Sequence, residues 1–185
     1  MKLGSLLIRG LVGPLFIGHG GQKLFGWFGG HGLEGTAGFF ESIGLRPGRR
    51  HATAAGVAET AGGAMLTLGL ATPVAAAMIS GTMATAIRKV HLKAGPWVTN
   101  GGWEFQAVVI AAVAGLADAG PGPLSIDAKR FPDFHGPALA ALAVAGGVAS
   151  SYLVTHPALN PPGPAPSEGE GDVAGDPAMQ GAAPS

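Results

Sequence analysis

Four apolar stretches, each about as long as a bilayer-spanning helix, contain ionisable residues. A helix needs about 20 mostly apolar residues to cross the hydrocarbon core. The stretches cover residues 5–27, 52–70, 72–90 and 103–119, and a weaker fifth one covers residues 136–154. This pattern predicts an all-α, polytopic membrane protein, built as a four-helix bundle with a fifth C-terminal helix and a disordered tail.

The composition agrees with a membrane protein and excludes several classes of function. Charged residues make up 12% of the chain, about half of their share in globular proteins. The net charge is zero, so a nucleic-acid partner is not expected. The chain contains no cysteine, which excludes a disulfide framework, a thiol nucleophile and a Cys-ligated metal site.

The same patterns divide the chain into three parts. Residues 1–128 contain the four main stretches, and residues 129–156 contain a connector and the expected fifth transmembrane helix. Residues 157–185 are rich in proline, glycine and acidic residues without periodicity, which predicts a disordered tail. A short interfacial helix or an ordinary loop fits residues 33–45 equally well. Lys and Arg are more frequent in the loops after the first and third stretches, which favours a cytoplasmic location for them.

The ionisable residues of the apolar stretches fall into two layers. A rise of about 1.5 Å per residue places Lys23 roughly 6 Å, and His19 and Glu59 roughly 12 Å, from the same membrane surface. Charges in the bilayer cost several kcal/mol and are usually functional or paired. The candidate ligand-binding or proton-relay residues of this layer are His19, Lys23, Glu59, Arg88, His91 and Glu104. The opposite layer holds Arg9, Asp118 and Asp127, which we interpret as a structural ion pair between Arg9 and one aspartate.

Each of these candidates also has a simpler interpretation. His19 could be an ordinary buried imidazole, and Lys23 could extend to the interface. Glu59 is harder to dismiss, because a carboxylate at this depth must be protonated or paired. Its candidate partners are Lys23 and His19. A metal site is not expected, since His91 and Glu104 lie roughly 10 Å closer to the surface than His19 and Glu59.

The same residues resemble a known family. The matching segments are Arg9, Phe16-Ile-Gly-His-Gly20, Lys23-Leu-Phe-Gly26, Glu59-Thr-Ala-Gly-Gly63, Leu68-Gly-Leu-Ala-Thr72, His91, Glu104 and Gly120-Pro-Gly-Pro-Leu-Ser-Ile-Asp127. Taken in this order, over about residues 4–128, they resemble the DoxX family of small bacterial integral membrane proteins. The expected fifth helix and the tail lie outside the resemblance.

The resemblance implies a multi-pass protein of the bacterial plasma (inner) membrane. Members of the family are linked with quinone-coupled thiosulfate oxidation, or with an oxidoreductase complex that defends against oxidative stress. The chain is therefore expected to be a membrane subunit of a redox complex, with soluble or membrane redox proteins as partners. A quinone is the candidate cofactor, and any thiol chemistry would belong to a partner. Whether the chain is itself an enzyme is left open, with a non-catalytic subunit favoured.

Two other classes of function fit the residues. Buried His, Glu and Lys side chains on facing helices would also suit a small proton-coupled transporter. Alternatively, the charges would only fix the packing of the helices, and the loops of a non-catalytic anchor would bind soluble proteins. The sequence leaves the oligomeric state, the substrate and the membrane orientation open.

Overall fold

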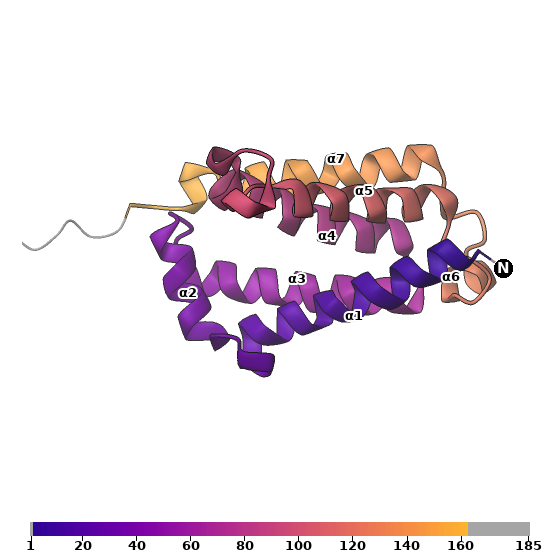
Figure 1. Cartoon of the computed structure of the whole chain (residues 1–185), viewed down its shortest axis with the longest axis horizontal. Coiled ribbons are helices and arrows are strands. Elements are labelled where there is room, and N and C mark those ends of the chain that lie inside the picture. Colours follow the sequence, from indigo (N-terminus) through magenta and orange to yellow (C-terminus); the bar gives the residue numbers. More distant parts are fainter. Residues whose placement is uncertain (1, 163–185) are drawn as a thin grey trace, which may run out of the picture.

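The computed structural model describes residues 2–162, and within them every regular element is helical. Five long helices run along one axis of the molecule (Figure 1). They are α1 (Leu3–Phe25), α3 (Gly48–Leu68), α4 (Thr72–Ala86), α5 (Glu104–Ala119) and α7 (Pro137–Val154). Two shorter helices are α2 (Gly32–Ser42) and α6 (Ile126–Arg130). The prediction of an all-α fold is therefore confirmed.

The long helices follow the five predicted stretches closely, with a few local differences. α1 continues through Pro14 and ends at Phe25, and the next residue, Gly26, has a φ of 74°, which turns the chain away from the helix. The third stretch is predicted to reach residue 90, but α4 ends at Ala86 and a π-helical turn, Ile87–His91, follows it. The fifth stretch forms α7, which packs against α4 and α5 and is therefore part of the bundle.

Two of the described helices, α1 and α7, are long and apolar enough to cross a membrane. α4 and α5 contain 15 and 16 residues, fewer than the about 20 of a full span. The π-helical turn extends α4 by one further turn. The predicted short helix over residues 33–45 forms α2, which packs against α3.

The predicted division of the chain at residues 128 and 156 stays a prediction. Most of the expected disordered tail, residues 163–185, lies outside the described residues. The first part of that expected tail forms a 3-10 turn, Pro157–Leu159. Asn160 then accepts a hydrogen bond from the Arg46 amide at 3.0 Å, which ties this segment to the loop before α3.

Glycines allow α1 and α3 to approach at backbone distance. A Cβ added at Gly20 would lie 2.0 Å from Thr60 Oγ1, and one added at Gly63 would lie 2.6 Å from the Gly13 carbonyl oxygen. Small residues permit this kind of contact between membrane helices. This close contact between α1 and α3, the α1–α3 seam, fixes the side chains of one helix relative to those of the other. Each of the two helices provides one member of the polar pair described below.

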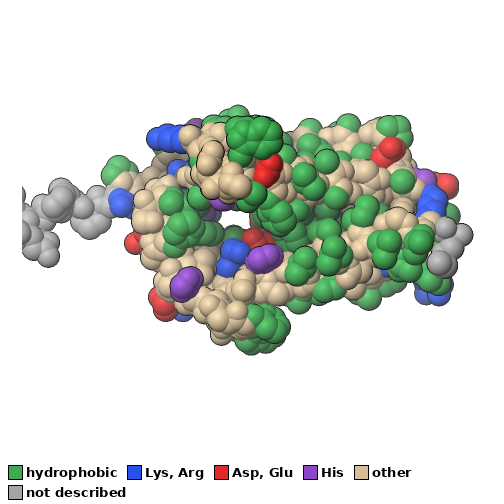
Figure 2. Space-filling view, in the orientation of Figure 1, with side chains coloured by type: hydrophobic (Ala, Val, Ile, Leu, Met, Phe, Trp, Pro, Cys, Tyr) green, Lys and Arg blue, Asp and Glu red, His purple; other side chains and the backbone are tan. Residues whose placement is uncertain are grey.

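The apolar core lies where the α1–α3 pair meets α4, α5 and α7. It includes Phe16, Leu66, Ile79, Val113 and Leu116, all buried. The two halves separate beyond this core, towards α2 and the loop between α4 and α5. Figure 2 shows a hollow between them, with acidic, basic and histidine side chains on its rim.

Candidate functional site

The centre of the candidate site is an ion pair between α1 and α3. Lys23 Nζ donates a hydrogen bond to Glu59 Oε2 at 2.6 Å. The Glu59 side chain is only 6% exposed, whereas that of Lys23 is 25% exposed. Glu59 is therefore paired, as expected for a carboxylate at its predicted depth in the membrane. Its partner is Lys23 and not His19.

The pair retains hydrogen-bonding capacity that no described residue uses. The Lys23 ammonium has three N–H donors, and its one hydrogen bond within residues 2–162 goes to Glu59. The second carboxylate oxygen, Glu59 Oε1, has no hydrogen-bond partner in that part of the chain. The site therefore offers both a donor and an acceptor to a ligand.

His19 lies one turn before Lys23 on α1, but its side chain is exposed. Its Nδ1 lies 3.1 Å from Gln22 Oε1, and its ring packs edge-on against Phe16 at a centroid distance of 6.1 Å. The bond to Gln22 was not anticipated from the sequence, although the spacing of three residues on a helix could have indicated it. Because Gln22 Oε1 only accepts, Nδ1 donates in this contact, and in the neutral ring Nε2 is then the acceptor.

Arg88 belongs to a different cluster, on the other half of the bundle. Its Nη1 donates to Ser151 Oγ at 3.1 Å and to Thr155 Oγ1 at 2.9 Å, and its guanidinium carbon lies 3.6 Å from the ring centroid of Tyr152. The π-helical turn that begins at Ile87 directs this side chain towards α7. The sequence places Arg88 in one group of candidate binding residues with Lys23 and Glu59, but in the structure its guanidinium contacts α7 and not that pair.

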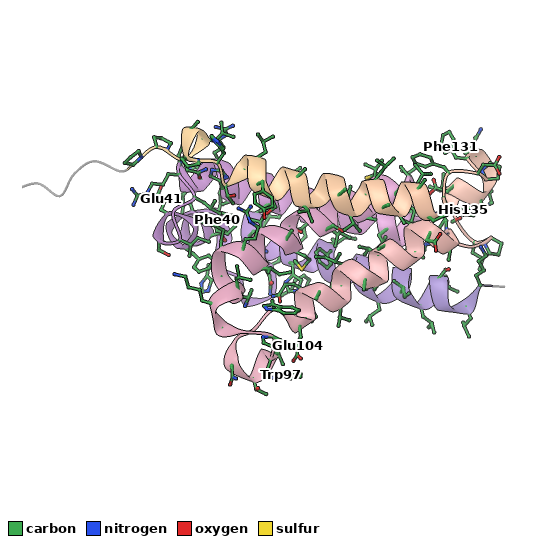
Figure 3. The ribbon with its side chains drawn as sticks, turned by 90° about the horizontal axis from the view of Figure 1, so that it is seen from above. Phe40, Glu41, Trp97, Glu104, Phe131 and His135 are labelled. Atoms are coloured by element: carbon green, nitrogen blue, oxygen red, sulfur yellow. The ribbon has the colours of Figure 1, made fainter. Side chains whose placement is uncertain are left out.

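His91 and Glu104 hold the loop between α4 and α5. His91 Nδ1 lies 2.7 Å from the Gly101 carbonyl oxygen, and Glu104 Oε1 accepts a hydrogen bond from the Val98 amide at 2.8 Å. Figure 3 shows Glu104 beside Trp97 on this loop. Neither His91 nor Glu104 forms a hydrogen bond with the Lys23–Glu59 pair. No group of three or more His, Cys, Asp or Glu side chains within residues 2–162 is placed to hold a metal ion.

The Arg9 end of the bundle is arranged differently. The Arg9 guanidinium donates to four backbone carbonyl oxygens at 2.8–3.1 Å, and the side chain is buried. The acceptors are the carbonyl groups of Leu66, Thr67, Pro121 and Leu124. The expected ion pair with Asp118 or Asp127 is not formed among the described residues, because carbonyl groups at the end of α3 and in the loop after α5 surround the guanidinium instead.

Asp127 instead caps α4. Its two carboxylate oxygens accept hydrogen bonds from the Ala71 amide, the Thr72 amide and the Thr72 hydroxyl, at 2.7–2.8 Å. An anion at a helix N-terminus is favourable because unpaired N–H groups and the helix dipole meet there. Asp118, by contrast, is exposed.

A cavity of about 180 Å³ lies beside this end, with Phe131 and His135 on its wall (Figure 3). Its polar side chains already have partners. Lys2 Nζ donates to the Ala119 carbonyl at 2.5 Å, and His135 Nδ1 lies 3.1 Å from the Asp118 carbonyl oxygen. The polar side chains at this end therefore hold the helix ends and loops together, which is a structural role.

Comparison with known proteins identifies the family. A family model described as DoxX matches residues 4–92, which include both members of the Lys23–Glu59 pair. The chain is also similar to a protein of Bacillus subtilis (strain 168) named "Putative oxidoreductase CatD", with 35% identity over 130 residues, 70% of this chain and 89% of that protein. No solved structure matches the chain. The chain belongs to the DoxX family and is an α-helical membrane protein.

Proposed function

We propose that this protein is an integral subunit of a redox complex in the bacterial plasma membrane, and that it crosses that membrane several times. In this proposal the Lys23–Glu59 pair binds the head group of a quinone-like ligand or relays protons to it. The observation that carries the proposal is the pair itself, a 2.6 Å contact between α1 and α3 whose carboxylate side chain is only 6% exposed. The name of the similar protein, an oxidoreductase, supports a redox role.

The chemistry of the pair suits both redox forms of a quinone. A free N–H of Lys23 can donate to a quinone carbonyl, while Glu59 Oε1 can accept from a quinol hydroxyl. Reduction of a quinone takes up two electrons and two protons, so a carboxylate at the head group is well placed to transfer protons. Lys23 compensates the charge of the carboxylate directly, at a distance of 2.6 Å.

The electrons have to come from another protein in this proposal. The chain contains no cysteine, so it supplies no thiol–disulfide couple, and the redox partner is expected to bind at the loops. The protein would then be a subunit that positions the ligand rather than a complete enzyme.

Quinone retention tests the proposal directly. The full chain, purified in mild detergent, is extracted with organic solvent, and bound quinone is quantified against protein for wild type and Glu59→Gln. We expect near-stoichiometric quinone in wild type and at least a tenfold loss in the variant. Absence of quinone from wild type, together with no binding of added quinone, would overturn the proposal.

Glu34→Gln is the matched control. Glu34 forms an exposed ion pair with Arg49, and the two side chains are 74% and 67% exposed. This variant makes the same chemical change and should retain quinone as wild type does. Thermal unfolding of both variants separates loss of the ligand from loss of the fold.

A further inference from the structure

We infer that the ligand of the Lys23–Glu59 site enters sideways from the bilayer, between α1 and α5, and that it is an amphiphile with a hydrocarbon chain. The inference rests on the proposed function, since it assigns a route and a ligand class to the same site. Four features of the described residues support it: a stripe of leucines, the position of His19, the apolar side chains at the hollow, and the depth of the ion pair.

Exposed leucines of α1 wind around the helix towards the site, since each step of four residues goes about 40° beyond a full turn. Leu3, Leu7, Leu11 and Leu15 follow one another at four-residue spacing and are 54–64% exposed. The next step of four residues reaches His19, which is also exposed, and the step after that reaches Lys23. In a membrane protein, an exposed apolar stripe of this kind contacts lipid chains. His19 therefore lies where the lipid-facing stripe meets the polar site.

The position of His19 is costly unless it serves a ligand. A polar side chain that faces hydrocarbon is unfavourable and is usually functional. If Nδ1 is engaged with Gln22, Nε2 is free to accept a hydrogen bond from a group that arrives from the lipid side. If the ligand entered through the loops instead, it would not pass His19, and the exposed position of this side chain would have no function.

The opening itself lies between α1 and α5. α1 packs far more extensively against α3 than against α5, and Figure 2 shows the hollow beyond the core, where these two halves part. On α5, the exposed apolar residues nearest to Glu104 are Phe105, 52% exposed, and Val108, 66% exposed. The hollow therefore has charged groups inside and apolar side chains on the adjacent helix surfaces.

The depth of the pair matches the shape of an amphiphile. Lys23 lies two residues before the end of α1, and the exposed aromatic residues Phe25 and Trp27 follow it. Exposed aromatic residues at a helix end mark the level of the lipid head groups. A ligand head at Lys23 would therefore lie at the interface, and its chain would extend along Leu15 and Leu11 into the hydrocarbon.

A labelling experiment tests the route, because the chain has no native cysteine. Leu15→Cys is reconstituted in lipid nanodiscs and labelled with a bulky maleimide. Association of a benzoquinone with a decyl chain is then followed by quenching of tryptophan fluorescence. We expect the label to slow association at least tenfold. The matched control is Leu7→Cys with the same label, two turns away on the same stripe, which should bind at the wild-type rate.

A second comparison tests the ligand class. The same benzoquinone without its chain should bind the unlabelled protein at least tenfold more weakly. Equal affinity of the two quinones, or an unchanged rate after labelling at position 15, would overturn this inference. If binding is nevertheless lost in Glu59→Gln, the proposed function survives that result. If wild type binds neither quinone, both proposals fail.

Discussion

The two ends of the bundle each combine one cation with one carboxylate, and they use them in opposite ways. At one end, Arg9 donates to four carbonyl groups and Asp127 accepts from three donors, so both charges are saturated by the chain itself. At the other end, Lys23 and Glu59 bind mainly each other and keep free donors and a free acceptor within the described residues. Saturated hydrogen bonding indicates a structural role for the Arg9 end, and spare hydrogen-bonding capacity indicates a binding role for the Lys23–Glu59 pair.

The difference follows from the groups that surround each charge. Helix ends and the loop over residues 120–125 converge on Arg9, and helix ends provide carbonyl groups without intrahelical partners. Glu59 lies in the middle of α3, where the backbone groups are already paired within the helix, and Lys23 contacts it from the last turn of α1. A charge in that position can be satisfied only by another side chain or by a ligand.

The largest effect is expected from Arg9→Met. The substitution leaves four carbonyl groups without their donor, and each unsatisfied buried group costs about 1–3 kcal/mol. We expect the free energy of unfolding, measured by denaturant titration in detergent, to fall by about 3 kcal/mol or more. Arg9→Lys, which keeps the charge with fewer donors, should give an intermediate loss. Wild-type stability in Arg9→Met would contradict the structural role of this end.

A smaller effect is expected at the α1–α3 seam. The Cβ of Gly20→Ala would lie 2.0 Å from Thr60 Oγ1 and 2.6 Å from the Gly56 carbonyl oxygen, and such overpacking costs about 1–3 kcal/mol. Gly10→Ala is the control on the same helix, where nothing lies within 4 Å. It should be neutral or slightly stabilising, since alanine favours helices. Equal melting temperatures for the two variants would show that the seam does not set the spacing.

A modest effect on stability is expected from Lys23→Met. Glu59, only 6% exposed, then loses its partner. Removal of one member of a fully buried ion pair costs about 3–5 kcal/mol, but Lys23 is a quarter exposed, so we expect a smaller loss of about 2 kcal/mol. Replacing both residues, as Lys23→Met with Glu59→Leu, should restore most of that loss, because an apolar pair needs no partner. A double-mutant cycle of thermal unfolding measures this. A loss as large as that of Arg9→Met would make the pair structural and weaken the comparison.

The smallest effect is expected from Arg49→Gln. This residue pairs with Glu34 on the surface, and exposed ion pairs are worth little. The unfolding midpoint should not change measurably, whether the ionic strength is low or high. A marked shift of the unfolding midpoint that depends on salt would mean that the exposed Arg49–Glu34 pair stabilises the bundle more than the Lys23–Glu59 pair does.

Much of the fold could be predicted from the apolar stretches. The first stretch was predicted over residues 5–27 and forms α1, Leu3–Phe25; the fifth was predicted over residues 136–154 and forms α7, Pro137–Val154. Hydropathy and length were sufficient here because a bilayer span imposes both. The end of α4 was missed, since the π-helical turn at Ile87 carries no signal in the apolar pattern.

The sequence by itself determined the helices and the depth of each charge. From depth alone, Lys23 could be proposed as a partner of Glu59, and Arg9 could be placed near Asp127. Only the tertiary structure decided which groups meet. Depth is one coordinate along the helix axis, whereas contact also depends on the direction in which each side chain points and on the path of the loops. For that reason Glu59 pairs with Lys23, one of its two candidate partners, whereas Arg88 contacts α7 and Arg9 donates to carbonyl groups.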